Sequence, residues 1–487
     1  MEYEKILTIL RRYSFAEKMK IAHKYSAAIM SPAGLIDVSK LRGRPLPWDI
    51  ETFVMFAVMA NEWNCKEFQG KNEKIFIDII NTIFNHTHSR LEEMGETEAF
   101  VDWFMITTGA VQFDLQEYYP YRLYRFNYYF SFVNEAINMP ELFFQKYGCN
   151  YWDFAVFAQF LWIAESSGQI LSQNIYDYWI SRHLKVASEL CISRENYISE
   201  LKAITSNAED YRYCLRPSYS FPFIREKNTV YLPVPHLLIR AVTSSLLFRL
   251  TDGNVKLPDL IGKNVLEAYL VKIISDSKLF DEVLPEHCIP RKGGMLRTPD
   301  VMARQGDKCV FFDSKFYSPK RDLRILSKEV LEETTERLAD TVIQIYRHIT
   351  EHFPAKYNCF KEKNSISKDS IWGIVVIRED PHIRPKYIYA RVAERLNITK
   401  GSSAYDWLCH HVGIVDINMI ERYCFTSSDI IKAILRNSEE GHTGDFWLSG
   451  TLENTTITNQ EVRDFKDRLI EETVAAANEM RQLGLMR

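Results

Sequence analysis

The stretch PDVMARQGDKCVFFDSK, Pro299–Lys315, joins two apolar segments through a Gly-Asp pair at 306–307, which is typical of a tight hairpin turn. With the turn at that position, Asp300 on the first strand lies opposite Asp313 on the second. Residues two apart in a strand share a face, so Lys315 projects beside Asp313. The sequence therefore predicts a hairpin with two carboxylates and one ammonium group on one face.

The opposite face of the predicted hairpin is apolar, so we expect this face alone to be buried in a core. It carries Val301, Ala303, Val310, Phe312 and Phe316. Facing carboxylates repel each other across a ladder, and a cation between them gives a reason to keep such a pair. Mg²⁺ or Mn²⁺ prefers oxygen ligands, can lower the pKa of a water, and stabilises charge on a phosphoryl oxygen. A nearby lysine can orient a water or neutralise developing charge. These parts suit hydrolysis of a phosphodiester.

Length and composition indicate an ordinary globular protein with more than one domain. The chain has 487 residues, of which 46% are hydrophobic and 25% charged, with a formal net charge of −4. This balance argues against a generally basic nucleic-acid binder. The nine cysteines form no CxxC pair, which favours a reducing compartment. The sequence has no signal-peptide core and no apolar run long enough to cross a bilayer, so we expect a cytoplasmic protein that is not a membrane protein.

The pattern along the chain predicts an α+β protein in three parts. Residues 1–245 have helical apolar spacing and form a helical accessory or regulatory domain, 246–425 form an α/β core with a central mixed sheet, and 426–487 form a C-terminal helical segment. Within the core we expect a helix over 263–274, strands over 282–289, 297–304 and 308–317, a helix over 326–352, and a strand over 371–379. A further hairpin is expected around the turn at 226–228.

An aromatic segment, YYPYRLYRFNYYF at 118–130, stands out in the helical part. Aromatic rings interleaved with arginines suit a base-stacking surface, but they also suit a helical core or a contact surface for a protein partner. We favour a helical core or a contact surface for a protein partner over a base-stacking surface. The absence of a polar constellation in this part of the sequence predicts a regulatory or assembly role, through a second copy of the chain or another protein.

The motif residues resemble the PD-(D/E)xK nuclease superfamily, which has the restriction-endonuclease-like fold. Pro299-Asp300 matches its PD, and Asp313-Ser314-Lys315 matches its (D/E)xK. The resemblance covers roughly residues 260–380 and includes the expected order of helix, three strands, helix and strand. It implies that Asp300, Asp313, Lys315 and Glu267 are catalytic, and that Mg²⁺ or Mn²⁺ is held by Asp300, Asp313, Glu267 and the Ser314 carbonyl. Gln344 matches a glutamine of some members, although His348 stands where their fuller pattern has a tyrosine.

A decoy elsewhere in the chain shows how specific this motif is. Pro258-Asp259 followed by Asp276-Ser277-Lys278 has the same letters. Its second part, however, ends a stretch with helical rather than alternating periodicity. Only the match at 299–315 is expected on two strands joined by a turn of suitable length.

A local excess of basic residues surrounds the motif. Residues 291–328 contain ten basic and four acidic residues in a chain whose net charge is −4. Phosphate contacts need such an excess, although a solvated charged surface has the same composition. The predicted nucleic-acid contacts are Arg297, Lys320, Arg321, Arg324 and Gln344, and DNA rather than RNA is the expected partner.

Two function classes follow from these observations. The first is a metal-dependent nuclease, which by family analogy resembles restriction or anti-phage defence effectors. The second is a non-catalytic nucleic-acid-binding or scaffold protein that has kept the nuclease fold. The pair His348 and His352 has metal-ligand spacing but no third ligand, so we expect ordinary core or surface histidines.

Overall fold

The computed structural model divides the chain into two compact units, each assembled from separate stretches of sequence. Unit 1 comprises Met1–Val133, Asn138–Gly253 and Phe465–Arg487, and unit 2 comprises Asn134–Ile137 and Asn254–Asp464. The structure describes residues 2–34, 36, 41, 43, 45–63, 66–68, 72–95, 97–112, 117–167, 173–291, 294–325, 327–353, 360–361, 366–439 and 456–485. The main division, at 253–254, falls a little after the expected boundary at 245.

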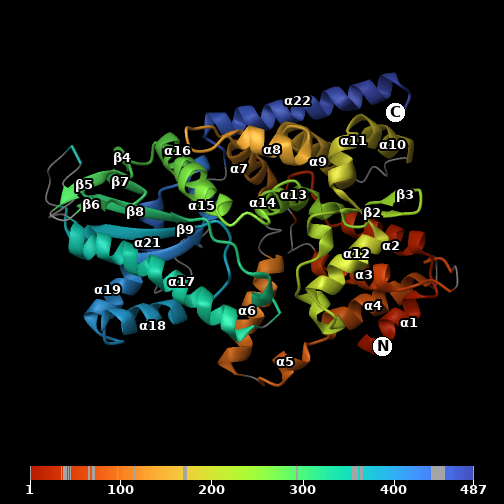
Figure 1. Ribbon diagram of the computed structural model, residues 1–487, viewed down its shortest axis with the longest axis horizontal. Coiled ribbons are helices and arrows are strands. Elements are labelled where there is room, and N and C mark those ends of the chain that lie inside the picture. Colours follow the sequence, from red (N-terminus) through yellow and green to blue (C-terminus); the bar gives the residue numbers. More distant parts are fainter. Residues whose placement is uncertain are drawn as a thin grey trace. The chain divides into compact units, whose positions relative to one another are not determined.

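Unit 1 is mainly helical, as expected (Figure 1). Its helices are α1 (Ile6–Leu10), α2 (Phe15–Ala27), α3 (Pro47–Met59), α4 (Glu73–Asn85), α5 (Ser89–Glu92), α6 (Glu98–Gln112), α7 (Tyr119–Ser131), α8 (Met139–Tyr147), α9 (Tyr151–Ser166), α10 (Gln173–Arg182), α11 (Leu184–Glu189), α12 (Arg194–Ile204), α13 (Leu238–Ala241), α14 (Ser244–Thr251) and most of α22 (Gln460–Gln482). The expected hairpin is confirmed as β2 (Phe223–Glu226) and β3 (Thr229–Tyr231). The short strand β1 (Cys191–Ser193), which the sequence analysis missed, pairs with β2 in parallel.

The aromatic segment forms the core of unit 1. Helix α7 buries Tyr119, Tyr121, Leu123, Tyr124, Phe126, Tyr129 and Phe130. Its two arginines are buried as well, and the Arg122 guanidinium lies 3.3 Å from the Glu117 carboxylate. Because these rings are enclosed, they are not available as a base-stacking surface, and the core interpretation is the one that fits their burial.

Unit 2 is built around a five-stranded mixed sheet in the order β10–β9–β8–β7–β4. The strands are β4 (Glu282–Pro285), β7 (Val301–Gln305), β8 (Lys308–Lys315), β9 (Ile371–Ile377) and β10 (Val412–Asp416). Strands β8, β9 and β10 are parallel neighbours, whereas β7 is antiparallel to both β8 and β4. The helices are α15 (Leu257–Ile261), α16 (Glu267–Ser277), α17 (Lys328–Arg347), α18 (Pro385–Leu396), α19 (Ser403–His411), α20 (Ile417–Thr426) and α21 (Ile430–Glu439). A helical region followed by a mixed sheet is thus confirmed.

The expected first and second strands are each interrupted. The segment 282–289 divides into β4 and β5 (Cys288–Arg291), and 297–304 divides into the end of β6 (Gly294–Arg297) and β7. Strands β5 and β6 pair with each other at the end of the sheet beyond β4 and β7 (Figure 1). The strand β10 was not foreseen, because its five residues follow a helix without a turn signal.

Helices α16 and α17 lie on opposite sides of this sheet (Figure 1). A Cβ atom on Gly373 of β9 would come within 3.0 Å of Ile345 on α17, so only glycine lets the helix pack this closely. On the other side, the ring of Phe280, just after α16, meets the ring of Phe312 at 6.4 Å between centroids. Phe311 and Phe312 are both fully buried, so the expectation that only one hairpin face is buried was wrong.

The C-terminal part 426–487 does not form a unit of its own, contrary to expectation. Residues up to Asp464 belong to unit 2, and α22 continues from there as part of unit 1. The reason is the apolar face of α22, where the Phe465 ring lies 5.7 Å from the rings of both Tyr124 and Trp152. Of the helices in the described ranges, none has both the length and the apolarity that a bilayer crossing requires.

Candidate active site

The predicted hairpin and its register are confirmed. Strands β7 and β8 are joined by the expected turn at 306–307, where Gly306 has a φ of 60°. Gln305 pairs with Lys308, and the ladder ends with the pair Val301 and Phe312. One further step along the same register would place Asp300 opposite Asp313, as the sequence predicted.

Asp300 itself lies just outside β7, at a β-bulge. Residues 286–287 separate β4 from β5, whereas 298–300 separate β6 from β7, so one side of this long hairpin has an extra residue. Beyond the bulge the two sides stay paired, because the Thr298 N–H donates a hydrogen bond of 3.0 Å to the His287 carbonyl. Glu286 is left opposite both Pro299 and Asp300. Bulges of this kind redirect a side chain at the end of a strand.

The redirected Asp300 carboxylate caps the free edge of β8. Its Oδ2 accepts hydrogen bonds from the Ser314 N–H at 2.6 Å and from the Ser314 Oγ–H at 2.7 Å. The side chain therefore takes the place of a ladder partner that β7 no longer supplies. Ser314, expected to contribute its carbonyl to a metal, is engaged here through its amide and hydroxyl groups.

Asp313 and Lys315 project together from β8, as their spacing predicted. The Asp313 side chain is 2% exposed, and its Oδ2 lies 2.7 Å from the Lys315 Nζ. Lys315 is 32% exposed and so connects the buried carboxylate with the surface. Desolvation acts to lower the pKa of Lys315, but Asp313, Asp300 and Glu267 together raise it above its usual value. The ammonium group therefore stays charged at neutral pH.

The carboxyl groups are destabilised as anions. Burial, with the charges of Asp300, Glu286 and Asp313, raises the pKa of Glu267 to about 8. Burial and the charge of Asp313 raise the pKa of Asp300 to about 6, and burial also raises that of Asp313. Without a cation, protons are the simplest way to relieve this crowding.

The carboxylate cluster offers oxygen donors of the kind that a divalent cation prefers. The charge of Asp313 acts on Asp300 and raises its pKa, so the two carboxylates are close neighbours. The buried Oδ2 of Asp313 has the Lys315 charge nearby but no aligned hydrogen-bond donor in the described ranges. Buried carboxylate oxygens of this kind are those that a hard cation prefers. As the side chains lie, however, no three His, Cys, Asp or Glu groups of the described residues converge as a finished metal site.

Glu286 is a residue of this site that the sequence analysis missed. Its charge acts on both Glu267 and Asp313, and its Oε1 lies 3.5 Å from the Arg297 guanidinium. The signal for it is the bulge, since the extra residue places Glu286 beside Asp300. A sequence read strand by strand does not reveal a bulge, because nothing in the letters shows where the two ladders change register.

The predicted nucleic-acid contacts have different surroundings. Arg297 has a 59% exposed side chain and Arg321 is exposed, whereas Lys320 hydrogen-bonds the Glu333 carboxylate at 2.6 Å. Arg324 is 7% exposed, so its assignment as a surface contact was wrong. It directly follows the 3₁₀ turn Arg321–Leu323, which folds it inward.

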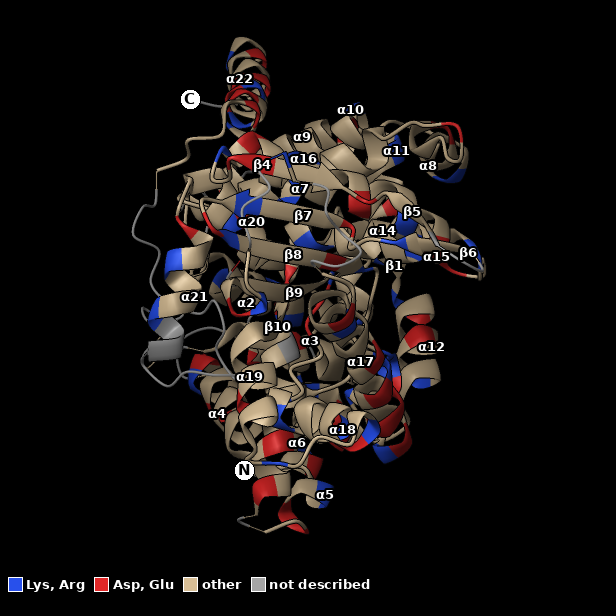
Figure 2. Cartoon of the chain, turned by 90° about the vertical axis from the view of Figure 1, so that its left-hand side faces the viewer, with Lys and Arg blue, Asp and Glu red and all other residues tan. Residues whose placement is uncertain are grey.

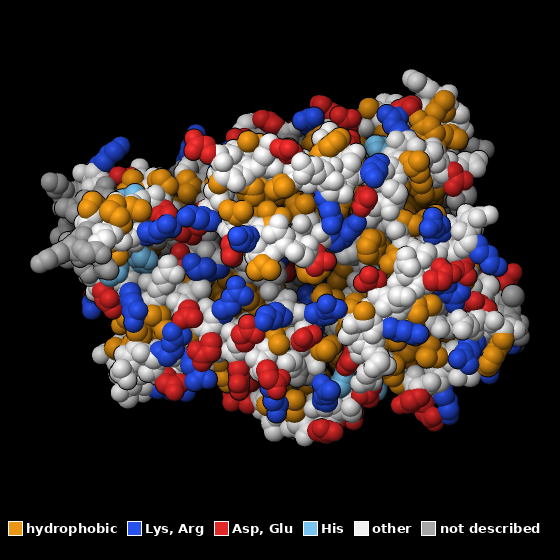
Figure 3. All heavy atoms as spheres, viewed as in Figure 1, with side chains coloured by type: hydrophobic (Ala, Val, Ile, Leu, Met, Phe, Trp, Pro, Cys, Tyr) orange, Lys and Arg blue, Asp and Glu red, His pale blue; other side chains and the backbone are white. Residues whose placement is uncertain are grey.

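Figure 3 shows basic and acidic side chains interspersed on the face in view, and Figure 2 shows basic and acidic residues spread over the elements of the chain. The sequence stretch 291–328, with its excess of basic residues, is described by the structure except for residues 292, 293 and 326. Lys292 of that stretch lies outside the described residues.

Gln344 lines a hollow on the outside of α17. This hollow encloses about 340 Å³ and is also lined by Asp340, Ile343, Arg347, His348, His352 and Arg395. The two histidine rings lie 5.7 Å apart, and burial, His352 and Lys315 lower the pKa of His348 to about 4. A neutral, buried His348 agrees with the expectation of an ordinary core histidine.

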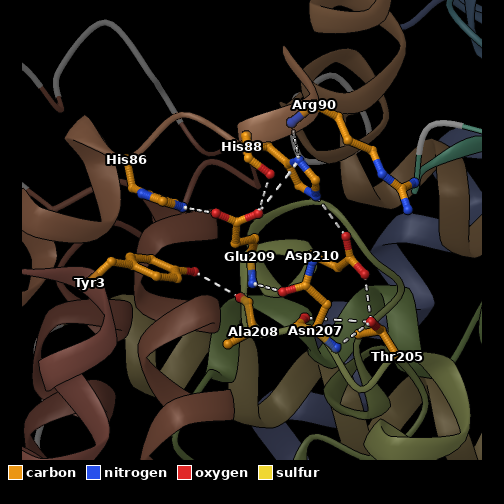
Figure 4. Close-up of polar contacts among 10 residues, drawn as sticks. Tyr3, His86, His88, Arg90, Thr205, Asn207, Ala208, Glu209 and Asp210 are labelled. Carbon is orange, nitrogen blue, oxygen red and sulfur yellow. Dashed lines mark hydrogen bonds and ion pairs between the residues drawn. The ribbon is translucent and has the colours of Figure 1, made fainter. Parts of the chain in front are cut away.

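A second polar cluster lies in unit 1 and serves as a reference for the first. This histidine cluster consists of His86, His88, Glu209 and Asp210 (Figure 4). His88 Nε2 lies 2.8 Å from Asp210 Oδ1, and His86 Nε2 lies 3.6 Å from Glu209 Oε1. Ser89 also donates a hydrogen bond of 2.6 Å to Glu209. Each carboxylate here has a donor of its own, which is the pattern of a structural network.

Comparison of the chain with models of known protein families, with curated proteins and with solved structures gives no match. The chemistry of the candidate site therefore rests on its residues alone.

Proposed function

We propose that this chain is a divalent-cation-dependent nuclease that hydrolyses phosphodiester bonds of nucleic acid. The observation that carries the proposal is the meeting of Asp300 and Asp313 at the bulge, with Lys315 2.7 Å from Asp313. Buried like charges are costly, and a sequence gains little stability from them unless a cation is bound there. DNA is the substrate that the resemblance to PD-(D/E)xK nucleases favours.

In this proposal Asp300, Asp313 and Glu267 hold Mg²⁺ or Mn²⁺, with the Ser314 carbonyl as a further ligand. The cation, when bound, supplies Lewis-acid activation of a water and neutralisation of phosphoryl charge. Lys315 keeps its proton next to Asp313, because the surrounding carboxylates raise its pKa. It therefore acts by position and charge, holding an oxygen of the phosphodiester and stabilising the transition state.

The order of elements in unit 2 supports the same proposal at the level of the fold. A helix that begins with Glu267 is followed by β4, β7 and β8, by the long helix α17, and by β9 parallel to β8. This is the order that the restriction-endonuclease-like core would have. The additional hairpin β5–β6 is an insertion at the end of the sheet next to the carboxylates.

Arg297, Arg321 and Gln344 are the proposed contacts to nucleic acid, because their side chains reach the surface. Lys320 can join them only if it leaves Glu333. Unit 1 is proposed as a regulatory or assembly part that binds a second copy or another protein. We place the protein in the cytoplasm, because all of its described cysteines are free thiols. We place it in a defence setting by family analogy alone.

The test is incubation of the purified chain with plasmid DNA, in Mg²⁺ or Mn²⁺, with and without a chelator. A parallel reaction with single-stranded RNA decides between the two substrates. We expect cleavage of DNA that the chelator stops and that Asp300→Asn and Asp313→Asn each abolish. Cleavage that survives both substitutions would belong to a contaminant and would refute the proposal.

A non-catalytic binding or scaffold role is the second candidate. It is favoured by the present pairing of Lys315 with Asp313 and of Ser314 with Asp300, which leaves no finished metal site among the described residues. DNA binding without cleavage in either metal, at unchanged affinity in Asp313→Asn, would establish this role instead.

A further inference from the structure

We propose that Glu286 is a fourth carboxylate of the cation site, and that Arg297 is its movable counter-ion, released when a phosphodiester binds. The inference rests on the nuclease function proposed above. It adds a residue that the motif does not contain, and it predicts that nucleic acid and cation bind cooperatively.

The bulge gives Glu286 its place. Pro285 of β4 pairs with Val301 of β7, so the next residue, Glu286, stands beside Asp300 at the same end of the sheet. Asp300 in turn lies one step beyond the end of the β7–β8 ladder, next to Asp313. Three neighbouring strands therefore bring three carboxylates to one end of the sheet.

The electrostatic pattern agrees with this placement. Glu286 acts on Glu267 and on Asp313, although neither belongs to its own strand. At the centre lies Asp313 Oδ2, a buried oxygen with the Lys315 ammonium 2.7 Å away. A buried carboxylate amid three others, with one ammonium group beside it, indicates that positive charge is still missing from the cluster.

The formal charges indicate how much charge is missing. Four carboxylates face two basic groups, Lys315 and Arg297, which leaves a charge of −2 when all are ionised. One divalent cation neutralises that charge. When Arg297 leaves Glu286 for a phosphate, the cluster loses one positive charge, so its attraction for the cation increases.

Arg297 is suited to such a transfer. Its side chain is 59% exposed, and its 3.5 Å contact with Glu286 is longer than an aligned hydrogen bond. Exposed ion pairs of this type contribute little to stability, so breaking one costs little. A guanidinium group binds a phosphate through two parallel hydrogen bonds, which more than replace the contact that is lost.

The test compares Mn²⁺ affinity, measured by calorimetry without nucleic acid, in the wild-type chain and three variants. Glu286→Gln should weaken Mn²⁺ binding by roughly tenfold or more. Arg297→Met should tighten it several-fold, because the competing positive charge is removed. The control Glu282→Gln, which removes a carboxylate from an ion pair with Arg304 farther along β4, should leave the affinity unchanged.

A second measurement separates this role from a purely structural one. In the absence of metal, fluorescence anisotropy with a DNA duplex should show tighter binding by Glu286→Gln, because Arg297 loses an anionic partner, and weaker binding by Arg297→Met. The double variant should bind DNA as weakly as Arg297→Met alone. A merely damaged fold would weaken both metal and DNA binding in Glu286→Gln.

The outcomes distinguish the two proposals. Wild-type Mn²⁺ binding that is unchanged in Glu286→Gln overturns the role of Glu286 and leaves the nuclease proposal standing. Tighter Mn²⁺ binding in Glu286→Gln, or weaker metal-free DNA binding, overturns it too. No Mn²⁺ binding by the wild-type chain removes the proposed nuclease function, and this inference with it.

Discussion

The carboxylate site of unit 2 and the histidine cluster of unit 1 differ in how burial and neighbouring groups act on their carboxylates. The carboxylate site consists of Glu267, Glu286, Asp300 and Asp313 with Lys315. In unit 2, burial and neighbouring charges raise the carboxyl pKa values, to about 8 for Glu267 and about 6 for Asp300. In unit 1, a hydrogen bond from Ser89 lowers the pKa of Glu209. The pKa of Asp210 is also lowered, since hydrogen bonds from His88 and Thr205 outweigh its burial.

The difference separates a cluster whose contacts stabilise the fold from one that we propose to bind a cation. In the histidine cluster each carboxylate meets a hydrogen-bonding partner and no second carboxylate crowds it, with His88 beside Asp210 and Ser89 donating to Glu209 (Figure 4). The carboxylate site places like charges together, and the buried Asp313 Oδ2 is offset by the Lys315 ammonium 2.7 Å away. Natural structures keep such arrangements mainly at functional positions.

The largest expected effect belongs to Lys315. Lys315→Ala should reduce DNA cleavage by about 10²–10³-fold, since a preorganised charge at the reacting group is lost. Mn²⁺ affinity should be kept or increased, because a positive charge next to Asp313 disappears. Cleavage of plasmid DNA and calorimetry with Mn²⁺ measure the two effects.

Lys278→Ala is the matched control for this change. Lys278 belongs to the decoy motif, and the structure places it at the exposed C-terminal end of α16, as the helical periodicity predicted. Equal losses of cleavage in both variants would show that the strand motif is not the catalytic site.

Asp313→Asn should not destabilise the metal-free fold, whereas loss of a partner in the histidine cluster should. Removing this charge should weaken Mn²⁺ binding by more than about 100-fold, which exceeds the usual loss for an outer-sphere partner. The free energy of unfolding of the metal-free protein should stay the same or rise, because a like charge is removed and Lys315 keeps Asp300 and Glu267 nearby. Urea denaturation without metal measures this, and a marked loss of stability would show that Asp313 is structural.

The pH dependence of stability should also differ between the clusters. Asp300 and Glu267 bind protons more tightly in the folded state than in the unfolded state, so their raised pKa values stabilise the metal-free fold at low pH. That contribution is lost as the pH rises from about 4 through about 8. Asp210 and Glu209 have lowered pKa values, so their contribution is lost as the pH falls below about 4.

Unfolding by urea at a series of pH values, in the presence of a chelator, tests this dependence. Asp300→Asn should flatten the decrease between pH 4 and pH 8. The same decrease in the variant as in the wild-type chain would assign it to other groups.

The smallest expected effect is that of His88→Ala, and it concerns stability alone. His88 is 2% exposed and lies 2.8 Å from Asp210, so its loss leaves a buried carboxylate without that partner. We expect a loss of about 1–3 kcal/mol in the free energy of unfolding, with unchanged Mn²⁺ affinity. Ser89→Ala, which removes only an exposed hydrogen bond to Glu209, is the milder comparison. Weaker Mn²⁺ binding in His88→Ala would contradict the division between the clusters.

The sequence by itself determined the hairpin and its register. Alternation of apolar residues and a Gly-Asp turn act over a few residues, so the pairing of β7 with β8 followed from the letters around 299–315. The helical character of residues 1–245, the helix at the decoy and the shared direction of Asp313 and Lys315 followed from periodicity in the same way.

Only the tertiary structure decided what surrounds these residues. The bulge that moves Asp300 out of β7 and brings Glu286 beside it depends on how two ladders join, and the burial of Arg324 depends on how a turn packs. The return of α22 to unit 1 depends on rings far apart in the chain. The physical reason is that periodicity and turn chemistry are local, whereas burial and charge crowding sum over groups that meet only after folding.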